Sequence, residues 1–260
     1  MLSKNEIKEI RALGQKKFRD ERGLFVVEGE KLVDEALRSG FDVVDLYRTD
    51  DIGQETMGRI SQLTHPSPVL AVVRQPQKMA LPAFGPDALV LALDGVRDPG
   101  NLGTILRIAD WFGIRQVLAS EDTVEVYNPK VVQATMGAIF RVQVHYCDLP
   151  KVLQSAAAGG FSDRAHFSAS GTKNQSSGAR SGVPVYGTFL EGANIYETDL
   201  TAGGILVMGS EADGISPAVA ATVTQKLFIP PFPAGVRTSE SLNVAVATAI
   251  CCSEFRRRIA

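Results

Sequence analysis

The chain has 260 residues, 45% of them hydrophobic and 22% charged, and its 27 Lys and Arg against 29 Asp and Glu give a formal net charge of -2. This length and composition predict a globular protein with one large domain or two modest ones. No apolar run is long enough to cross a bilayer and the start of the chain has no apolar signal stretch, so we expect neither a membrane protein nor an exported one.

Cysteine and histidine usage argues against a metal centre or a disulfide framework. The chain has 3 cysteines and 3 histidines, no C-x-x-C pair, and histidines that stand far apart in the sequence. We therefore expect a cytoplasmic protein without a metal site. The near-neutral net charge also argues against nucleic acid, because proteins that bind phosphates usually carry a basic excess.

The first part of the chain reads as a small α/β domain. Ile7, Ile10 and Leu13 recur at three- and four-residue spacing behind a possible Ser3 cap, which predicts a surface helix. A helix is also predicted near 30–38. Strands are predicted at 24–27, 43–47 and 69–73. Proline and glycine then break every regular pattern, so we predict a domain over residues 1–78 and a linker over 79–87.

Residues 88–260 read as a larger α/β domain with a mostly parallel sheet, because buried strands alternate with helices. The predicted strands are 88–93, 116–119, 183–186, 204–208 and 226–229. The predicted helices are 102–112, 129–139, one that begins near 217, and 242–258. A stretch near 160–182, rich in alanine, glycine and serine, does not fit. We interpret it as a flexible surface insertion, with a functional lid as the less favoured alternative.

Three turns carry the candidate chemistry, because ligands of open α/β sheets bind beyond the carboxyl ends of the strands. The first turn contains Asn101 and, on the helix that follows, Arg107. The second places Glu211 directly after an apolar strand, and the third has a polar cluster at 239–243 before a helix of apolar and small residues. An ordinary turn explains each of the first two equally well, and small residues on the last helix are more often core. No dinucleotide, P-loop, zinc-protease or hydrolase motif is present.

Taken in order, these segments resemble the three motifs of the SpoU (TrmH) family of SPOUT methyltransferases, which methylate RNA ribose 2′-hydroxyls with S-adenosylmethionine. The segment DPGNLGTILR at 98–107 resembles motif one, and the segment VMGSEADGIS at 207–216 resembles motif two. Motif three resembles IP at 229–230 together with ESLNVAVA at 240–247. The N-terminal segment is similar, more weakly, to the small substrate-binding domain of many members.

The resemblance implies a C-terminal trefoil knot that holds the cofactor, although true knots are nearly absent from proteins. It also implies a homodimer whose active sites lie at the subunit interface. The cofactor would be S-adenosylmethionine. Its pocket would be lined by Met208, Gly209, Ile229, Pro230 and Leu242.

The resemblance also implies the catalytic roles. Asn101 would order the motif-one loop, and Arg107 would sit at the ribose hydroxyl. Glu211 would fix the loop or orient Arg107, while Ser241 and Asn243 would position the target phosphate and ribose. Because a guanidinium stays protonated in proteins, we expect Arg107 to hold the phosphate and the developing alkoxide, with a role as base the alternative.

Structured RNA is the expected partner, despite the net charge, because basic residues gather locally. Arg11, Lys16, Lys17 and Arg19 lie in a stretch without an acid, and we expect them to bind RNA. Ribosomal RNA is favoured over transfer RNA by analogy with the accessory domains of ribosomal-RNA methylases. A transfer-RNA 2′-O-methyltransferase and a catalytically silent ribosome-assembly factor remain alternatives, whereas a small-molecule α/β enzyme has no motif to support it.

Overall fold

A computed structural model describes residues 2–77, 81, 87–159, 182–233 and 239–259 of the chain. The chain divides into two compact units. The first unit contains Met1–Met79, Arg97–Trp111 and Val124–Gln143, and the second contains Ala80–Val96, Phe112–Thr123 and Val144–Ala260. The predicted insertion near 160–182 lies, except for Gly182, outside the described residues.

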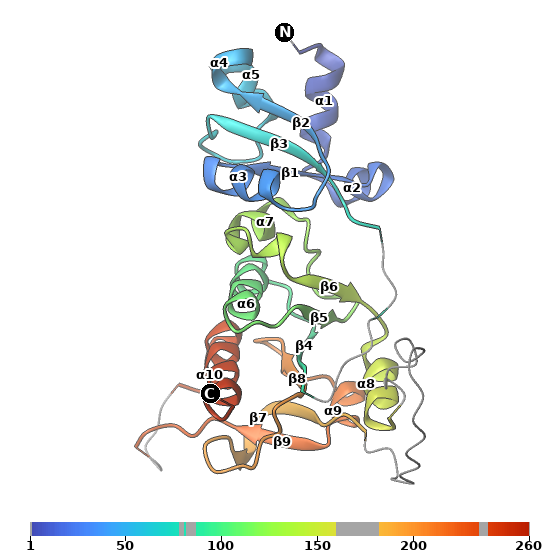
Figure 1. The fold of residues 1–260 in the computed structure, drawn as a ribbon, viewed down its shortest axis with the longest axis vertical. Coiled ribbons are helices and arrows are strands. Elements are labelled where there is room, and N and C mark those ends of the chain that lie inside the picture. The colour runs from blue at the N-terminus through green and yellow to red at the C-terminus, as the bar shows by residue number, and fades with distance from the viewer. Residues whose placement is uncertain (1, 78–80, 82–86, 160–181, 234–238, 260) are drawn as a thin grey trace, which may run out of the picture. The chain divides into compact units, whose positions relative to one another are not determined.

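A three-stranded antiparallel sheet organises the first unit (Figure 1). Its strands are β1 (Leu24–Glu28), β2 (Val43–Arg48) and β3 (Val69–Arg74), in the order β1-β3-β2. Because β3 is central, its first five residues are all buried. The helices of this part are α1 (Lys4–Ala12), α2 (Lys16–Arg22), α3 (Glu30–Arg38), α4 (Thr49–Ile52) and α5 (Gln54–Ile60).

The N-terminal helix forms as its sequence predicts. The Ser3 hydroxyl accepts a hydrogen bond from the Glu6 backbone nitrogen at 3.2 Å, and Glu6 accepts one from the Ser3 nitrogen at 2.6 Å. This capping box satisfies donors that the first helical turn leaves without partners. The buried face of α1 joins a core that spans α1, α5 and the strands: Ile7, Ile10, Leu13, Val26, Met57, Ile60, Leu70 and Val72.

Three further helices belong to the first unit: α6 (Pro99–Trp111), α7 (Pro129–Thr135) and the short 3-10 helix η1 (Ala138–Phe140). Helices α6 and α7 pack closely at Gly103, where a Cβ atom would lie 2.8 Å from the backbone carbon of Ala134. Helix α7 in turn contacts β1, because the Gln133 amide donates to the Glu28 carbonyl at 2.8 Å. Residues far apart in sequence thus share one packed unit.

A six-stranded sheet with the order β6-β5-β4-β8-β7-β9 organises the second unit. The strands are β4 (Leu89–Asp94), β5 (Gln116–Ala119), β6 (Gln143–Tyr146), β7 (Val185–Asn194), β8 (Gly204–Gly209) and β9 (Gln225–Phe228). Strand β4 runs parallel to β5 and β8, and β7 runs parallel to β8 and β9. The prediction of a mostly parallel sheet is therefore confirmed.

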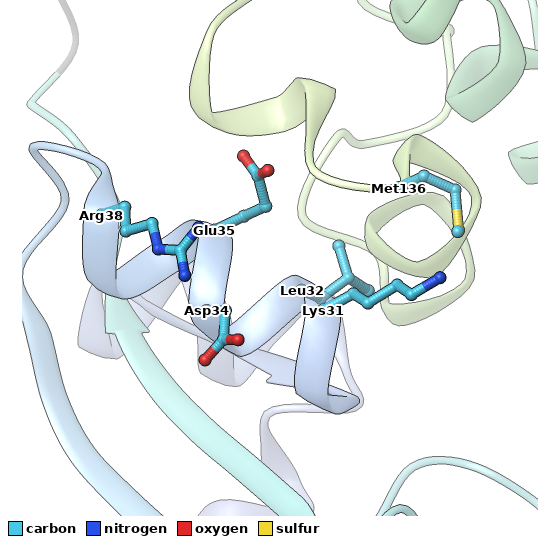
Figure 2. A pocket seen from close by; sticks show the side chains of 6 residues that line it. All are labelled: Lys31, Leu32, Asp34, Glu35, Arg38 and Met136. Carbon is cyan, nitrogen blue, oxygen red and sulfur yellow. The ribbon is translucent and has the colours of Figure 1, made fainter.

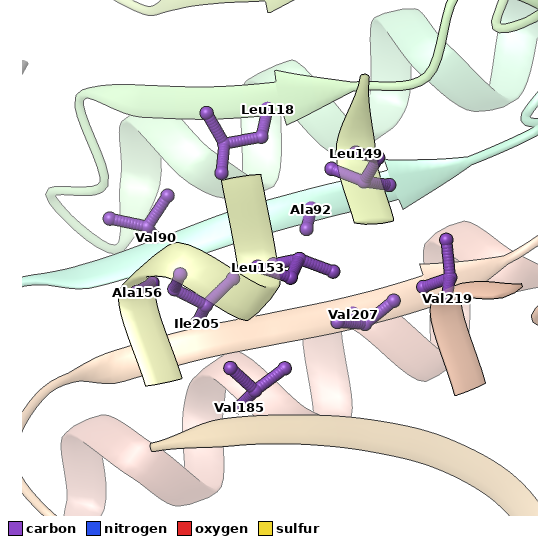
Figure 3. Close-up of a cluster of buried hydrophobic side chains, with 10 residues drawn as sticks. All are labelled: Val90, Ala92, Leu118, Leu149, Leu153, Ala156, Val185, Ile205, Val207 and Val219. Atoms are coloured by element: carbon purple, nitrogen blue, oxygen red, sulfur yellow. The ribbon is translucent and has the colours of Figure 1, made fainter. Parts of the chain in front are cut away.

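Helices cover the hydrophobic surface of this sheet. On one face, α8 (Leu149–Ala157) and α9 (Pro217–Ala220) pack on the strands, and the buried cluster is shown in Figure 3. Elsewhere α10 (Val244–Arg257) contacts β8. The Phe255 ring packs edge-on against the Tyr186 ring, with 5.1 Å between the ring centroids. Burial of β4 along its whole length is the pattern expected for a parallel strand covered on both faces.

Some elements differ from the sequence prediction. Strand β6 and helices α2, α4, α5 and α8 were not predicted, and β7 extends to Asn194 rather than ending near 186. Helix α6 begins at Pro99, earlier than the predicted start at 102. No helix among the described residues is both long and apolar enough to span a membrane. The predicted domain boundary at 79–87 stays a prediction.

Candidate active site

The carboxyl ends of β4 and β8 lie side by side in the second unit, because Leu93 pairs with Met208 and Asp94 with Gly209. The side chain of Asp94 is buried, and its Oδ2 accepts a hydrogen bond from the Ser216 backbone nitrogen at 2.7 Å. This bond ties the end of β4 to the loop that follows β8. The end of β4 and the motif-two loop therefore meet at one edge of the sheet.

The loop after β8 is a tight backbone structure that requires glycine. Ser210 and Gly214 exchange two backbone hydrogen bonds, each 3.1 Å long. A Cβ atom at Gly209 would overlap the backbone carbon and oxygen of Gly214 and the backbone nitrogen of Ile215. Gly214 itself has φ +68°, a conformation that glycine adopts without strain. Glu211 lies in this loop and is exposed to solvent.

The loop after β4 is fixed in a similar way. Gly95 has φ +68°, and its backbone nitrogen donates to the Ser120 hydroxyl at 2.9 Å. Ser120 in turn donates to Asp122 at 2.6 Å. A Cβ atom at Gly95 would lie 3.2 Å from the Asp122 carboxylate oxygen. Ordered, side-chain-free backbone therefore lines this edge of the sheet at both strand ends.

These residues suit an adenosyl group, which needs backbone hydrogen-bonding groups beside apolar surface. Gly209, Ile229 and Pro230 are partly buried, and the Leu242 side chain is 46% exposed. Met208 differs from the prediction in one respect, since its side chain is only 1% exposed. Met208 can therefore offer a ligand its backbone but not its side chain.

The motif-one residues lie in the first unit. The Asp98 carboxylate accepts from the Asn101 backbone nitrogen at 2.8 Å, so Asp98 and not Asn101 caps the start of α6. Arg107 lies on the same helix and is exposed. Its guanidinium makes no hydrogen bond or ion pair with any described residue. Arg107 is therefore available to bind an anion.

Asn243 begins the last helix. Its side-chain oxygen accepts from the backbone nitrogens of Ala245 and Val246, at 3.0 and 3.3 Å, and so caps α10. Ser241, two residues earlier, is exposed. Glu211, Ser241 and Asn243 lie in the second unit, so the prediction that they act with Asn101 and Arg107 in one site stays a prediction.

Comparison with known proteins decides the family. The model of the SpoU rRNA Methylase family matches residues 88–253, which contain all three motif segments. This chain belongs to the SpoU methylase family. The model of the MRM3-like substrate binding domain matches residues 4–78. The predicted resemblance is confirmed.

Relatives of this SpoU protein cover nearly its whole length. The 23S rRNA (guanosine(2553)-2′-O)-methyltransferase RlmP of Bacillus subtilis is 28% identical over 271 residues, covering 98% of this chain and 97% of RlmP. A protein from Porphyromonas gingivalis, assigned to the TrmH family of RNA methyltransferases, matches with TM-score 0.80 and 41% identity over 99% of both chains. An AdoMet-bound rRNA methyltransferase from Sinorhizobium meliloti matches with TM-score 0.79 and 27% identity, covering 100% of this chain and 98% of that one.

One of the four basic residues predicted to bind RNA in this SpoU protein serves the fold instead. Arg19 is only 2% exposed. Its Nε donates to Glu125 at 3.1 Å and its Nη1 donates to the Leu13 carbonyl at 2.8 Å. Sequence proximity to Lys16 and Lys17 had suggested a shared role for Arg19. The burial of Arg19 and its protein partners do not fit RNA contact, so we exclude Arg19 from the proposed RNA-binding residues.

The other three basic residues are exposed. Lys16 pairs with Asp20 at 2.6 Å, and the Lys17 ammonium lies 6.0 Å from the centre of the Phe18 ring. Arg11 lines a groove beside α1. Among these three, Arg11 and Lys17 make no ion pair with a described residue.

A small hollow of about 250 Å³ beside α3 carries charges of both signs (Figure 2). Its lining residues are Lys31, Leu32, Asp34, Glu35, Arg38 and Met136. Glu35 is already engaged by Arg141, which also donates to Asp110 at 2.8 Å. The two ion pairs of Arg141 connect α3 and α6 to the segment after η1. The mixed charge of the hollow gives no reason to expect an anionic ligand.

Proposed function

We propose that this protein transfers the methyl group of S-adenosylmethionine to the 2′-hydroxyl of a ribose in structured ribosomal RNA. The observation that carries the proposal is the match of the SpoU rRNA Methylase family to residues 88–253, with all three motif segments in order. The similarity to RlmP over 98% of the chain favours ribosomal RNA as substrate. The protein is thus an RNA 2′-O-methyltransferase that uses S-adenosylmethionine.

The edge of the sheet at β4 and β8 would hold the cofactor. The missing side chain of Gly209 lets the loop backbone at Gly214 and Ile215 pack against the strand end, and Ile229 and Leu242 would add apolar contact to the adenosyl group. When bound, S-adenosylmethionine supplies an electrophilic methyl group on a sulfonium. The loops that surround it owe their order to Asp94 and Ser120, whose hydrogen bonds fix the backbone in advance.

Arg107 would bind the anionic part of the reaction. The transfer needs the 2′-oxygen aligned with the methyl group, and a fixed guanidinium fork can hold the neighbouring phosphate in that alignment. As the 2′-hydroxyl loses its proton to water during the transfer, the oxygen would develop negative charge, which the same fork would stabilise. Arg107 suits this role because it is exposed and has no ion-pair partner among the described residues.

The start of α10 would position the RNA. Asn243 caps this helix, and Ser241 lies exposed just before it. A helix N-terminus attracts phosphate through its backbone N–H groups and its dipole. Ser241 could add a hydroxyl donor to the same phosphate, while Glu211 in the motif-two loop would orient Arg107 in the assembled site.

We further infer a homodimer with sites at the subunit interface. Leu242 lies just before α10 and Val246 lies in its first turn, and the two side chains are 46% and 49% exposed. Large apolar side chains exposed close together favour burial against a partner. The proposal also includes a trefoil knot formed by the segment after β9, a cytoplasmic location, and separate domains over 1–78 and 88–260.

The direct test is methyl transfer by purified protein. S-adenosylmethionine labelled in its methyl group is incubated with an unmodified 23S rRNA transcript, and the digested RNA is searched for labelled 2′-O-methyl nucleoside. Labelled product supports the proposal. Binding of RNA without transfer would instead favour the silent assembly factor, and transfer only to transfer RNA would overturn the choice of substrate.

A further inference from the structure

A second hollow, of about 650 Å³, lies along α1 and is strongly basic. Residues of α1, α2, α5 and the turn before α2 line it: Lys4, Ile7, Lys8, Arg11, Ala12, Gln15, Phe18, Gly58 and Arg59. Four of these residues carry a positive charge and none carries a negative one. We call Lys4, Lys8, Arg11 and Arg59 the groove cations.

The groove cations lack ion-pair partners in the described part of the chain, although the Glu28 carboxylate interacts electrostatically with Arg11. Three neighbouring basic residues form ion pairs instead: Lys16 with Asp20, Arg19 with Glu125 and Arg22 with Glu9. Like charges held together repel one another unless an anion lies between them. The groove therefore has an electrostatic preference for a polyanion.

The spacing of the cations suits a nucleic-acid strand. Lys4, Lys8 and Arg11 follow one another at four and three residues on α1, so they lie on one helix face. Seven residues of helix span about 10 Å, which is the length of about three stacked nucleotides of one strand. Arg59, near the end of α5, reaches the groove from a different helix. Phosphates could therefore be held from two helices.

Phe18 gives the groove an aromatic surface. Its side chain is partly exposed and lines the hollow together with Ile7. Aromatic rings in basic grooves stack on the unpaired bases of single-stranded nucleic acid, and this stacking does not depend on base identity. A duplex keeps its bases stacked inside and cannot use such a ring. The combination of cations and ring therefore favours a single strand.

We propose that this groove binds a single-stranded segment of the RNA substrate, with the groove cations on its phosphates and a base stacked on Phe18. The proposal rests on the proposed function and adds the RNA form and the residues that grip it. Lys4, Lys8 and Arg59 lie outside the basic stretch that the sequence had indicated.

The test uses the full-length protein and two probes, the 23S rRNA transcript and a short labelled oligouridylate. In Lys8→Gln/Arg59→Gln, two phosphate contacts are lost. At about 0.7 per contact, the magnitude of the slope of log affinity against log salt for oligouridylate should fall by about 1.4, and affinity at 0.1 M salt should fall about 25-fold. The matched control, Arg22→Gln/Arg74→Gln, removes the same charge from exposed residues paired with Glu9 and Asp42.

A second variant, Phe18→Leu, keeps an apolar side chain but removes the ring. It should weaken oligouridylate binding at least about fivefold while leaving the salt slope unchanged. Thermal melting of each variant checks that it folds, and S-adenosylmethionine binding checks the catalytic domain separately.

Several outcomes would overturn the proposal that the groove binds RNA. These are a groove double variant that binds like its control, equal competition by duplex RNA, and unchanged binding in Phe18→Leu. If wild-type protein methylates RNA in these cases, only the groove proposal fails. If wild-type protein transfers no methyl group to any RNA, the proposed function fails instead, whatever the groove variants bind.

Discussion

Replacing Gly209 by alanine perturbs the motif-two loop at its tightest point. The new methyl group would overlap the backbone carbon and oxygen of Gly214 and the backbone nitrogen of Ile215. These are backbone atoms, so no side chain can turn aside to make room. The loop must move, and the two 3.1 Å hydrogen bonds between Ser210 and Gly214 resist that movement.

The size of the effect follows from these contacts. Forced overpacking costs about 1–3 kcal/mol, and two lost backbone hydrogen bonds cost about 0.5–1.5 kcal/mol each. The free energy of unfolding should therefore fall by about 2–6 kcal/mol if the loop stays rigid. If the loop shifts instead, the protein recovers stability but presents altered backbone to the cofactor. A binding loss of only about 1.4 kcal/mol raises the Kd for S-adenosylmethionine tenfold.

Two measurements on the same variant cover both responses. Urea denaturation followed by circular dichroism gives the free energy of unfolding, and calorimetric titration gives the Kd for S-adenosylmethionine. Gly40→Ala is the control, because Gly40 is exposed with no atom within 4 Å of an added Cβ. We expect it to change stability by less than about 0.5 kcal/mol. If Gly209→Ala matched Gly40→Ala in both measurements, the close-approach argument would be refuted.

Three further changes test other parts of the account. Glu125→Gln should lower the free energy of unfolding by about 3–5 kcal/mol in urea titration, because it leaves the buried Arg19 charge without its carboxylate. Hydrogen bonds from Arg257, and then from Arg258, lower the pKa of Glu254 to about 2 from 4.5. The stability they give is thus present above pH 4.5 and lost as the pH falls toward 2, and Glu254→Gln should flatten this acid-side loss in urea titrations at a series of pH values. Arg107→Lys should lower kcat roughly 100-fold in the methyl-transfer assay without changing the Kd for S-adenosylmethionine, because an ammonium lacks the guanidinium fork.

Each of these three predictions has an outcome that would contradict it. A cost below about 1 kcal/mol for Glu125→Gln would mean that the pair behaves like an exposed one. An unchanged pH profile in Glu254→Gln would remove that carboxylate as the source of acid sensitivity. If Arg107→Lys kept most of the rate, positioning by the fork would be wrong, and a role for this side chain as base would gain ground.

The parallel sheet could be predicted because its central strands carry their own signal. Strand β4 is a run of six buried residues, and β8 has the same apolar character. Strand β6 lacks that signal, because it lies at the edge of the sheet and none of its residues is fully buried. Helix α5 was missed for a related reason, since only Met57 and Ile60 are buried in it and Gly58 weakens its helical pattern.

The residues of the candidate site were likewise predictable only where their signal is local in the sequence. The glycines and polar residues of the three motifs stand next to strand ends in the sequence, so they could be found by order and spacing. The role of Arg19 could not, because its partner Glu125 lies 106 residues away. The basic groove was hidden as well, since Arg59 joins the cations of α1 only through the packing of α5. Local patterns thus predict the reaction, while long-range packing decides which basic residues stay exposed for the proposed RNA contact.

Ribose-methylation mapping of ribosomal RNA tests the central claim most directly. RNA is compared from cells with the gene, cells without it, and deleted cells that express the wild-type protein or Arg107→Lys. We predict that deletion removes 2′-O-methylation at a ribosomal RNA nucleotide, that the wild-type gene restores it, and that Arg107→Lys restores little of it. An identical methylation map with and without the gene would contradict the proposed ribosomal RNA methylation.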